Sequence, residues 1–133
     1  MIQGKIWGLT KLLEGNSSFE FHRLEVNAGG VCSKHKHIHK WNGFFVESGK
    51  LLVRVWKDYG LVDDIILEAG DYTRIVPGEY HQFEAIEDTV VFELYWVEFK
   101  SDDIVRETVT VSVARTVSHH TYECIFDLSD DDD

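Results

Sequence analysis

Short apolar segments alternate with glycine-containing turns along most of this chain, and this pattern constrains its fold more than any other feature. The segments are rich in Val, Ile, Phe, Tyr and Trp, which favour strands. Turn signals such as Ser48-Gly49 and Gly70-Asp71 recur at a spacing of about 8–12 residues, which is typical of a β-sandwich or barrel. The expected strands lie at residues 19–26, 43–46, 51–56, 61–67, 72–76, 81–86 and 90–97.

Two further segments fit this pattern less well. Residues 104–117 are rich in Val and Thr and are expected to form another strand. Leu9–Glu14 is the one weak helix candidate, and it is too short to carry a fold. We therefore predict an all-β protein.

Composition excludes several classes of protein. The chain has 133 residues, of which 44% are hydrophobic, so it fits one domain with a core of its own. The net charge of −11 argues against nucleic-acid binding, because phosphate backbones repel an acidic surface. With no apolar run long enough to span a bilayer and no leader-like N-terminus, we expect a cytoplasmic protein without membrane partners. Residues 127–133 contain five acids and no base, as in a disordered, solubilising tail.

Three histidines, His35, His37 and His39, are spaced two residues apart. In a strand they would point to one face, and Lys34 and Lys36 would point to the other. Converging imidazoles suit Zn, Fe, Ni and Cu. The alternative is a polar strand that faces solvent.

A second element is the segment Pro77-Gly78-Glu79-Tyr80-His81, which holds the only proline of the chain. Proline fixes the turn and stops the strand before it, so His81 begins the next strand at a defined point.

Together these elements resemble the two motifs of the cupin superfamily. In the first motif, five residues separate Gly29 from His35-x-His37, four residues follow to Asn42, and six more to Gly49; Asn42 replaces the usual Glu. In the second motif, Gly70 is followed by the turn that leads to His81, with the proline one place later than usual. The resemblance implies a cupin jelly-roll barrel, a double-stranded β-helix. We predict a single cupin domain over residues 1–126, with its core at about residues 20–100 and an extension at each end.

The same resemblance implies one divalent metal ion, which could be Zn, Fe, Mn or Ni. Its ligands would be His35, His37, Asn42 and His81. The amide of Asn42 is neutral and a weaker donor than a carboxylate, which lowers affinity for a hard cation. His39 would be an alternative ligand, a group behind the ligands, or an ordinary lining residue.

Alternation along the strands extends the candidate site. Counting from Asn42 and His81 places Phe44, Val46 and Phe83 on the inward face, as lining of a substrate pocket. Arg54 could meet a phosphate or carboxylate of a substrate, or lie on the surface. Glu93 could be a general base if its side chain points inward.

A finer resemblance indicates a function. Residues 33–49 and the acidic-hydrophobic segment 101–106 are similar to the cupin domain of type II mannose-6-phosphate isomerase. This domain is often fused to mannose-1-phosphate guanylyltransferase, and no nucleotide loop is seen here. The resemblance implies a small stand-alone enzyme that interconverts an aldose and a ketose, as a sugar or sugar phosphate. The alternatives are a ligand-binding or structural cupin with a weakened metal site, and an iron-dependent dioxygenase.

We also expect a homodimer. Small cupins commonly pair, and the apolar segment Ile6-Trp7-Gly8-Leu9 could cover an exposed sheet edge between two subunits.

Overall fold

The computed structural model describes residues 1–99, 102–107, 111–117 and 120–126. The chain divides into two compact units, Met1–Glu98 and Phe99–Asp133. The prediction of a single domain over residues 1–126 stays a prediction, and the acidic segment 127–133 lies outside the described residues. Within the part that is described, no helix has the length and apolar character needed to cross a membrane.

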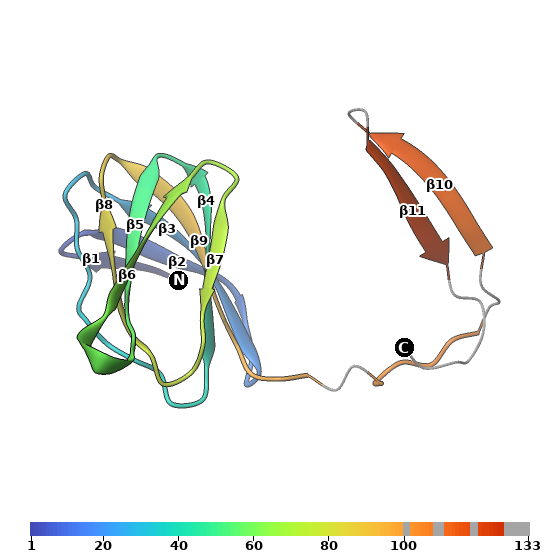
Figure 1. Cartoon of the computed structure of the whole chain (residues 1–133), viewed down its shortest axis with the longest axis horizontal. Coiled ribbons are helices and arrows are strands. Elements are labelled where there is room, and N and C mark those ends of the chain that lie inside the picture. Colours follow the sequence, from blue (N-terminus) through green and yellow to red (C-terminus); the bar gives the residue numbers. More distant parts are fainter. Residues whose placement is uncertain (100–101, 108–110, 118–119, 127–133) are drawn as a thin grey trace. The chain divides into compact units, whose positions relative to one another are not determined.

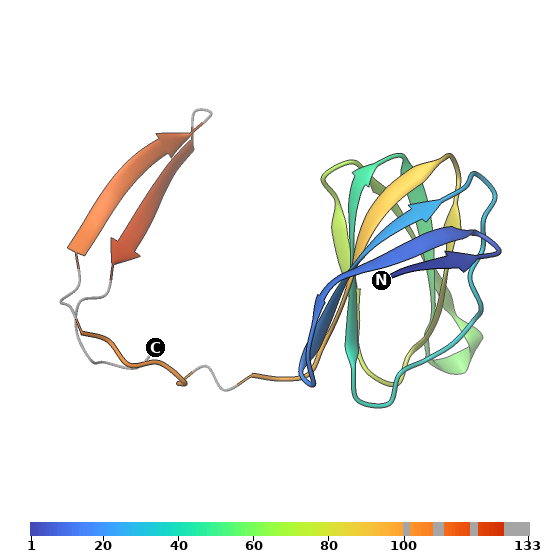
Figure 2. The ribbon, with the colours of Figure 1, turned by 180° about the vertical axis from the view of Figure 1, so that it is seen from behind.

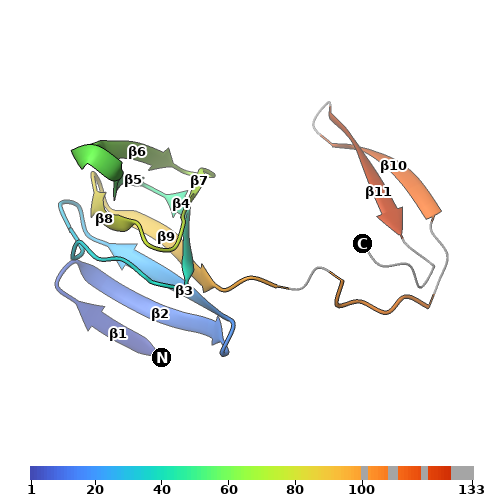
Figure 3. The same ribbon diagram turned by 60° about the horizontal axis from the view of Figure 1, so that its bottom comes forward.

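The first unit is made of two antiparallel sheets (Figure 1). The larger sheet has the strand order β1-β2-β3-β9-β4-β7, and the smaller has the order β6-β5-β8. Figure 3 shows the two sheets as layers, with β1 and β2 farthest from the smaller sheet. The strands are β1 (Ile2–Lys5), β2 (Gly8–Gly15), β3 (Phe19–Val26), β4 (Trp41–Ser48), β5 (Lys50–Trp56), β6 (Val62–Glu68), β7 (Tyr72–Ile75), β8 (Tyr80–Ala85) and β9 (Thr89–Trp96), with a short 3-10 helix at Asp58–Gly60.

The second unit contains an antiparallel hairpin of β10 (Val111–Val117) and β11 (His120–Phe126). The strand expected within residues 104–117 therefore starts at Val111, and residues 102–107 have no regular structure. All-β architecture with a jelly-roll arrangement is confirmed. The helix proposed at Leu9–Glu14 is wrong, because this segment belongs to β2 and pairs with β3.

The core lies between the two sheets and is built by alternation. In β5, Leu51, Val53 and Val55 are fully buried, while the residues between them are partly exposed. On the larger sheet, the buried side chains that face them include Leu24, Phe44 and Val91. Every second residue of these strands is apolar and points inward, so the two sheets share one apolar core.

The N-terminal strands β1 and β2 extend the larger sheet at its edge, as the blue strands in Figure 2 show. Trp7, between these strands, packs edge-on against Phe83 at 5.1 Å between ring centroids. Ile6 is fully exposed beside it. The homodimer expected through this segment stays a prediction.

Gly49, in the turn between β4 and β5, allows a test of the fold. Its φ is +93°, and an added Cβ would lie 2.3 Å from the carbonyl oxygen of Asp88 and 2.7 Å from Cα of Thr89. Gly70 has a φ of +90° with no atom within 4 Å of an added Cβ, so it isolates the effect of backbone conformation. We expect Gly49→Ala to lower the free energy of unfolding by about 3 kcal/mol and Gly70→Ala by about 1 kcal/mol. Urea unfolding of both variants measures this, and equal losses would contradict the close approach at Gly49.

Candidate metal centre

Three histidines converge at one end of the first unit. His35, His37 and His81 each offer a ring nitrogen, and these nitrogens all lie within 4.8 Å of one another. The ring centroids are 5.1 Å apart for His35 and His37, 4.6 Å for His35 and His81, and 5.5 Å for His37 and His81. The group could therefore hold one metal ion.

Backbone hydrogen bonds bring the two sequence motifs together at this point. The amide of His81 donates to the carbonyl of His35 at 2.8 Å, and the amide of His35 donates to the carbonyl of His81 at 3.1 Å. The amide of Gly78, in the proline turn, donates to the carbonyl of His37 at 2.7 Å. The turn is thus joined directly to the segment that carries the other two histidines.

His39 does not join this group. Residues 32–40 form no strand apart from an isolated bridge between His35 and His81, so the three histidines do not share a face by strand alternation. His39 is exposed and lies outside the cluster. The convergence of His35 and His37 comes from the path of the loop.

The ring nitrogens that face the centre are available as ligands. Nδ1 of His35 donates to the carbonyl of Ser33 at 2.8 Å, and Nδ1 of His81 donates to the carbonyl of Glu79 at 2.9 Å. In a neutral ring this leaves the lone pair on Nε2. Nε2 of His37 is buried with no hydrogen-bond partner. A buried polar atom without a partner is unfavourable, and a metal ion would satisfy it.

Electrostatics keep two of these rings in the neutral, metal-binding form. Burial, together with the nearby His35, His81 and Lys40, lowers the pKa of His37 to about 4. Burial is also the largest cause of the lowered pKa of His81. Both rings are therefore unprotonated near neutral pH, as metal binding requires.

Asn42 completes the inner side of the centre. Its side chain is buried, and Nδ2 donates to the carbonyl of Leu94 at 3.1 Å and to Glu93 Oε2 at 3.3 Å. These bonds direct Oδ1 toward Nε2 of His81, 3.0 Å away. With the proton of the neutral His81 ring on Nδ1, where it is donated to the carbonyl of Glu79, Nε2 and Oδ1 are both acceptors. Two atoms that bind one metal ion at about 2.1 Å, at right angles to each other, lie about 3 Å apart. A cation bound by both Oδ1 and Nε2 would therefore make their contact favourable. The residues present thus fit a divalent metal.

Glu93 lies behind Asn42, on the inward face of β9. Its side chain is buried and accepts hydrogen bonds from Asn42 and from Tyr95. Burial raises the pKa of this carboxyl group, and the two hydrogen bonds oppose the rise. The inward orientation that the sequence left open is the one the structure shows.

The family of the chain follows from its motifs, its fold and a match to known families. Residues 22–98 match the cupin domain family. The chain belongs to the cupins. A comparison with curated proteins finds no match.

Solved structures with the same fold include several cupins. KdgF from Halomonas sp. has a TM-score of 0.64 at 18% identity, over 74% of this chain and 89% of that chain. The Cnp3 cupin domain from Schizosaccharomyces pombe has a TM-score of 0.63 at 17% identity, over 74% and 69%. Oxalate decarboxylase from Bacillus subtilis has a TM-score of 0.66 at 13% identity, and the match covers 73% of this cupin but 27% of that chain. At these identities the likeness shows the fold alone.

A pocket of about 530 Å³ opens beside the metal centre of this cupin. One wall is the inward face of β1, β2, β3 and β9, and the other is the loop at residues 31–35 with Phe83 of β8. His35 and Glu93 both line it, so the pocket reaches the metal centre. The lining residues are Gln3, Lys5, Ile6, Trp7, Thr10, Glu20, His22, Val31, Cys32, Ser33, His35, Phe83, Glu93 and Tyr95.

The predicted pocket residues separate into three groups. Phe83 lines the pocket. Phe44 and Val46 point inward as expected, but they belong to the buried core and not to the pocket wall. Arg54 does not line the pocket, because it lies on the outer face of the smaller sheet, where it donates to Gln82 at 3.2 Å and to Glu84 at 2.6 Å.

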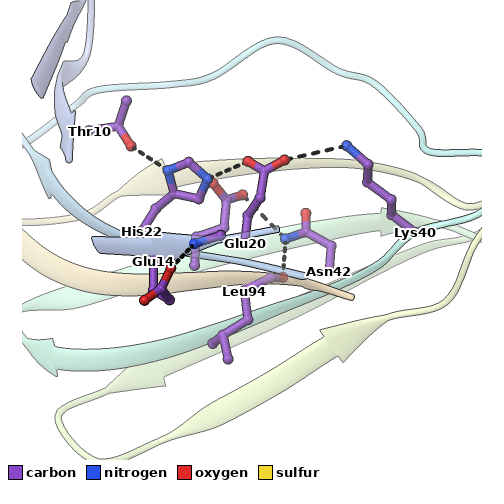
Figure 4. A network of polar contacts seen from close by, with 9 residues as sticks. Thr10, Glu14, Glu20, His22, Lys40, Asn42 and Leu94 are labelled. Atoms are coloured by element: carbon purple, nitrogen blue, oxygen red, sulfur yellow. Dashed lines mark hydrogen bonds and ion pairs between the residues drawn. The ribbon is translucent and has the colours of Figure 1, made fainter. Parts of the chain in front are cut away.

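Sequence reasoning missed one polar side of this pocket. Figure 4 shows His22 between Thr10 and Glu20, with Lys40 beyond Glu20. His22 is in phase with the buried Leu24 of the same strand, so alternation alone could have placed it inside. Nothing in the sequence shows that β1 and β2 would lie beside it.

Proposed function

We propose that this cupin is a metal-dependent isomerase that moves a proton between two neighbouring carbons of a small polyhydroxy carbonyl compound. The observation that carries the proposal is the position of Glu93: a buried carboxyl group lines the pocket and hydrogen-bonds to Asn42, which contacts the three-histidine group. The resemblance to type II mannose-6-phosphate isomerase supports aldose–ketose interconversion.

The residues of the chain would divide the work between binding and proton transfer. His35, His37 and His81 would hold the cation, with Oδ1 of Asn42 beside them. When bound, a divalent cation polarises a carbonyl oxygen of the substrate. Glu93 would accept the proton from one carbon and return it to the next, and Tyr95 would orient the carboxyl group by its hydrogen bond.

The charge of the pocket favours a sugar without a phosphate group. Lys5 is the single lysine or arginine among the lining residues that the structure describes, and Glu20 and Glu93 lie in the same pocket. A phosphate group usually needs several cationic or amide donors. We therefore narrow the substrate to an unphosphorylated aldose or ketose.

Hydrogen exchange at carbon tests this proposal. The full chain, purified without chelator or histidine tag, is analysed for bound metal and then incubated in D₂O with D-mannose, D-fructose or their 6-phosphates. Proton NMR should show deuterium entering C1 or C2 of an unphosphorylated sugar. A protein with full metal occupancy that exchanges none of these sugars would not be an aldose–ketose isomerase, and low metal occupancy would favour a binding or structural cupin.

The donor set favours a second candidate, an iron-dependent dioxygenase. Three imidazoles and one amide carry no charge, and such a site can hold ferrous iron with open positions. Mn(II) centres are described in the structural neighbour oxalate decarboxylase from Bacillus subtilis, so manganese belongs in the same metal screen. Oxygen consumption by the iron-loaded protein, without deuterium exchange, would favour this candidate.

A further inference from the structure

His22 lies in the pocket next to Glu93. The two residues are direct cross-strand partners on β3 and β9, and both line the pocket. Side chains opposite each other in an antiparallel pair lie about 5 Å apart at Cβ. The side chain of His22 is 16% exposed, so it is largely enclosed but still open to the pocket.

Glu20 fixes the orientation of the His22 ring. Nε2 of His22 lies 2.8 Å from Oε1 of Glu20, and a carboxylate accepts, so Nε2 carries the proton (Figure 4). In the neutral ring Nδ1 therefore carries the lone pair. Its neighbour, the hydroxyl oxygen of Thr10, is 3.5 Å away, at the outer limit of a hydrogen bond. In this tautomer the Thr10 hydroxyl donates that long bond, and Thr10 lines the same pocket, so a substrate hydroxyl could take its place at Nδ1.

Two further contacts hold this pair in place. The ring of Tyr95 packs edge-on against His22, with centroids 5.8 Å apart. Lys40 lies 3.9 Å from the other carboxylate oxygen of Glu20. A pocket-lining histidine whose ring is oriented by a carboxylate is an arrangement that proton-transfer catalysis uses.

We propose that His22 is a catalytic residue that carries the proton between the two substrate oxygens, and that Glu20 is its positioning residue. This inference rests on the proposed isomerase function and deepens it. Glu93 transfers the proton between the two carbon atoms of the α-hydroxy carbonyl unit, and His22 transfers the proton between its two oxygen atoms.

Together, Glu93 and His22 account for every proton that moves in the reaction. As Glu93 takes the proton from C2, the C–H electron pair forms the C1–C2 double bond, and the carbonyl pair moves to O1. Nδ1 of the neutral His22 ring takes the proton from O2 and gives it to O1. The electron pair left on O2 forms the C2 carbonyl, and the pair of the C1–C2 double bond takes the proton back from Glu93 to form the new C1–H bond. Both residues return to their starting states.

The test compares His22→Gln with His39→Gln, a matched change at an exposed histidine outside the metal group. With D-fructose as probe in the exchange assay, we expect His22→Gln to lower kcat roughly 100-fold with little change in KM, and His39→Gln to leave both unchanged. Metal content should be normal in both variants. A rise in KM alone, or unchanged kcat, would overturn the role of His22.

A second measurement needs no substrate. Long-range ¹H–¹⁵N NMR of the metal-loaded protein should show His22 as the Nε2–H tautomer, and Glu20→Gln should weaken that preference and lower kcat. An Nδ1–H tautomer in the unmodified protein would overturn the inference. If no sugar exchanges, the proposed function fails by itself, and the tautomer still decides the orientation on which the role of His22 depends.

Discussion

His81→Ala will leave the cupin without tightly bound divalent metal. The substitution removes one of the three imidazoles and leaves Oδ1 of Asn42 facing an empty space. Loss of a residue that only hydrogen-bonds to a metal ligand typically weakens metal binding roughly 10–100-fold. Loss of a ligand itself should therefore weaken metal binding by about 100-fold or more. Elemental analysis of the purified variant, followed by titration with Mn²⁺ and Zn²⁺ in a calorimeter, measures the change.

The fold of the variant must be separated from its metal binding, because His81 is almost completely buried. The metal-induced change in stability does this. At a metal concentration 100 times its Kd, the unmodified protein should gain about 2.7 kcal/mol of unfolding free energy. At the same metal concentration His81→Ala should gain almost none. His37→Ala should lose metal in the same way. Because the buried Nε2 of His37 has no hydrogen-bond partner in the protein, this substitution breaks no hydrogen bond at that atom.

His39→Ala is the matched control, since His39 is exposed and lies outside the group. It should keep its metal and its full metal-induced gain in stability. If His39→Ala lost metal as severely as His81→Ala, the assignment of the three ligands would be wrong.

Local patterns in the sequence account for most of the fold. The short segments, their alternation and the glycine turns predict strands β3 to β9 of the first unit, because each of these signals acts within a few residues. The error at Leu9–Glu14 has a physical reason. The segment has residues that a helix also accepts, and pairing of β2 with β3 decides its conformation.

The candidate metal centre was predictable for a different reason, because the spacing of His35, His37 and His81 resembles the two cupin motifs. Strand alternation alone would have grouped His39 with His35 and His37, and the path of the loop separates it from them. The orientation of Asn42 was not predictable. It depends on Leu94 and Glu93, which lie more than 50 residues away in the sequence.

Strand order explains what the sequence could not show about the pocket. β3 lies beside β9, so Glu20 faces Tyr95 and His22 faces Glu93 across a large separation in sequence. Such a register depends on the packing of the whole barrel. Arg54 is a different case, because it alternates with the buried Val53 and Val55 of β5, so alternation alone places its side chain on the outer face, beside Glu84.

Glu93→Gln will abolish most of the exchange activity while leaving the metal in place. Glutamine keeps the size of the side chain and an oxygen that can accept from Asn42 and Tyr95, but it cannot take a proton from carbon. A positioned general base contributes about 10²–10⁴-fold to the rate, so kcat for deuterium entry should fall by a similar factor. KM should change little, because binding groups elsewhere in the pocket remain.

Glu84→Gln is the matched control for this variant. It makes the same chemical change on β8, where Glu84 pairs with Arg54 on the outer face, away from the pocket. Its kcat should equal that of the unmodified protein, and both variants should hold as much metal as that protein. If Glu93→Gln lost metal, Glu93 would be acting through Asn42 to support the metal site. If it kept both metal and full activity, the proton would be carried by another group. Only loss of kcat with metal retained assigns Glu93 to the chemical step.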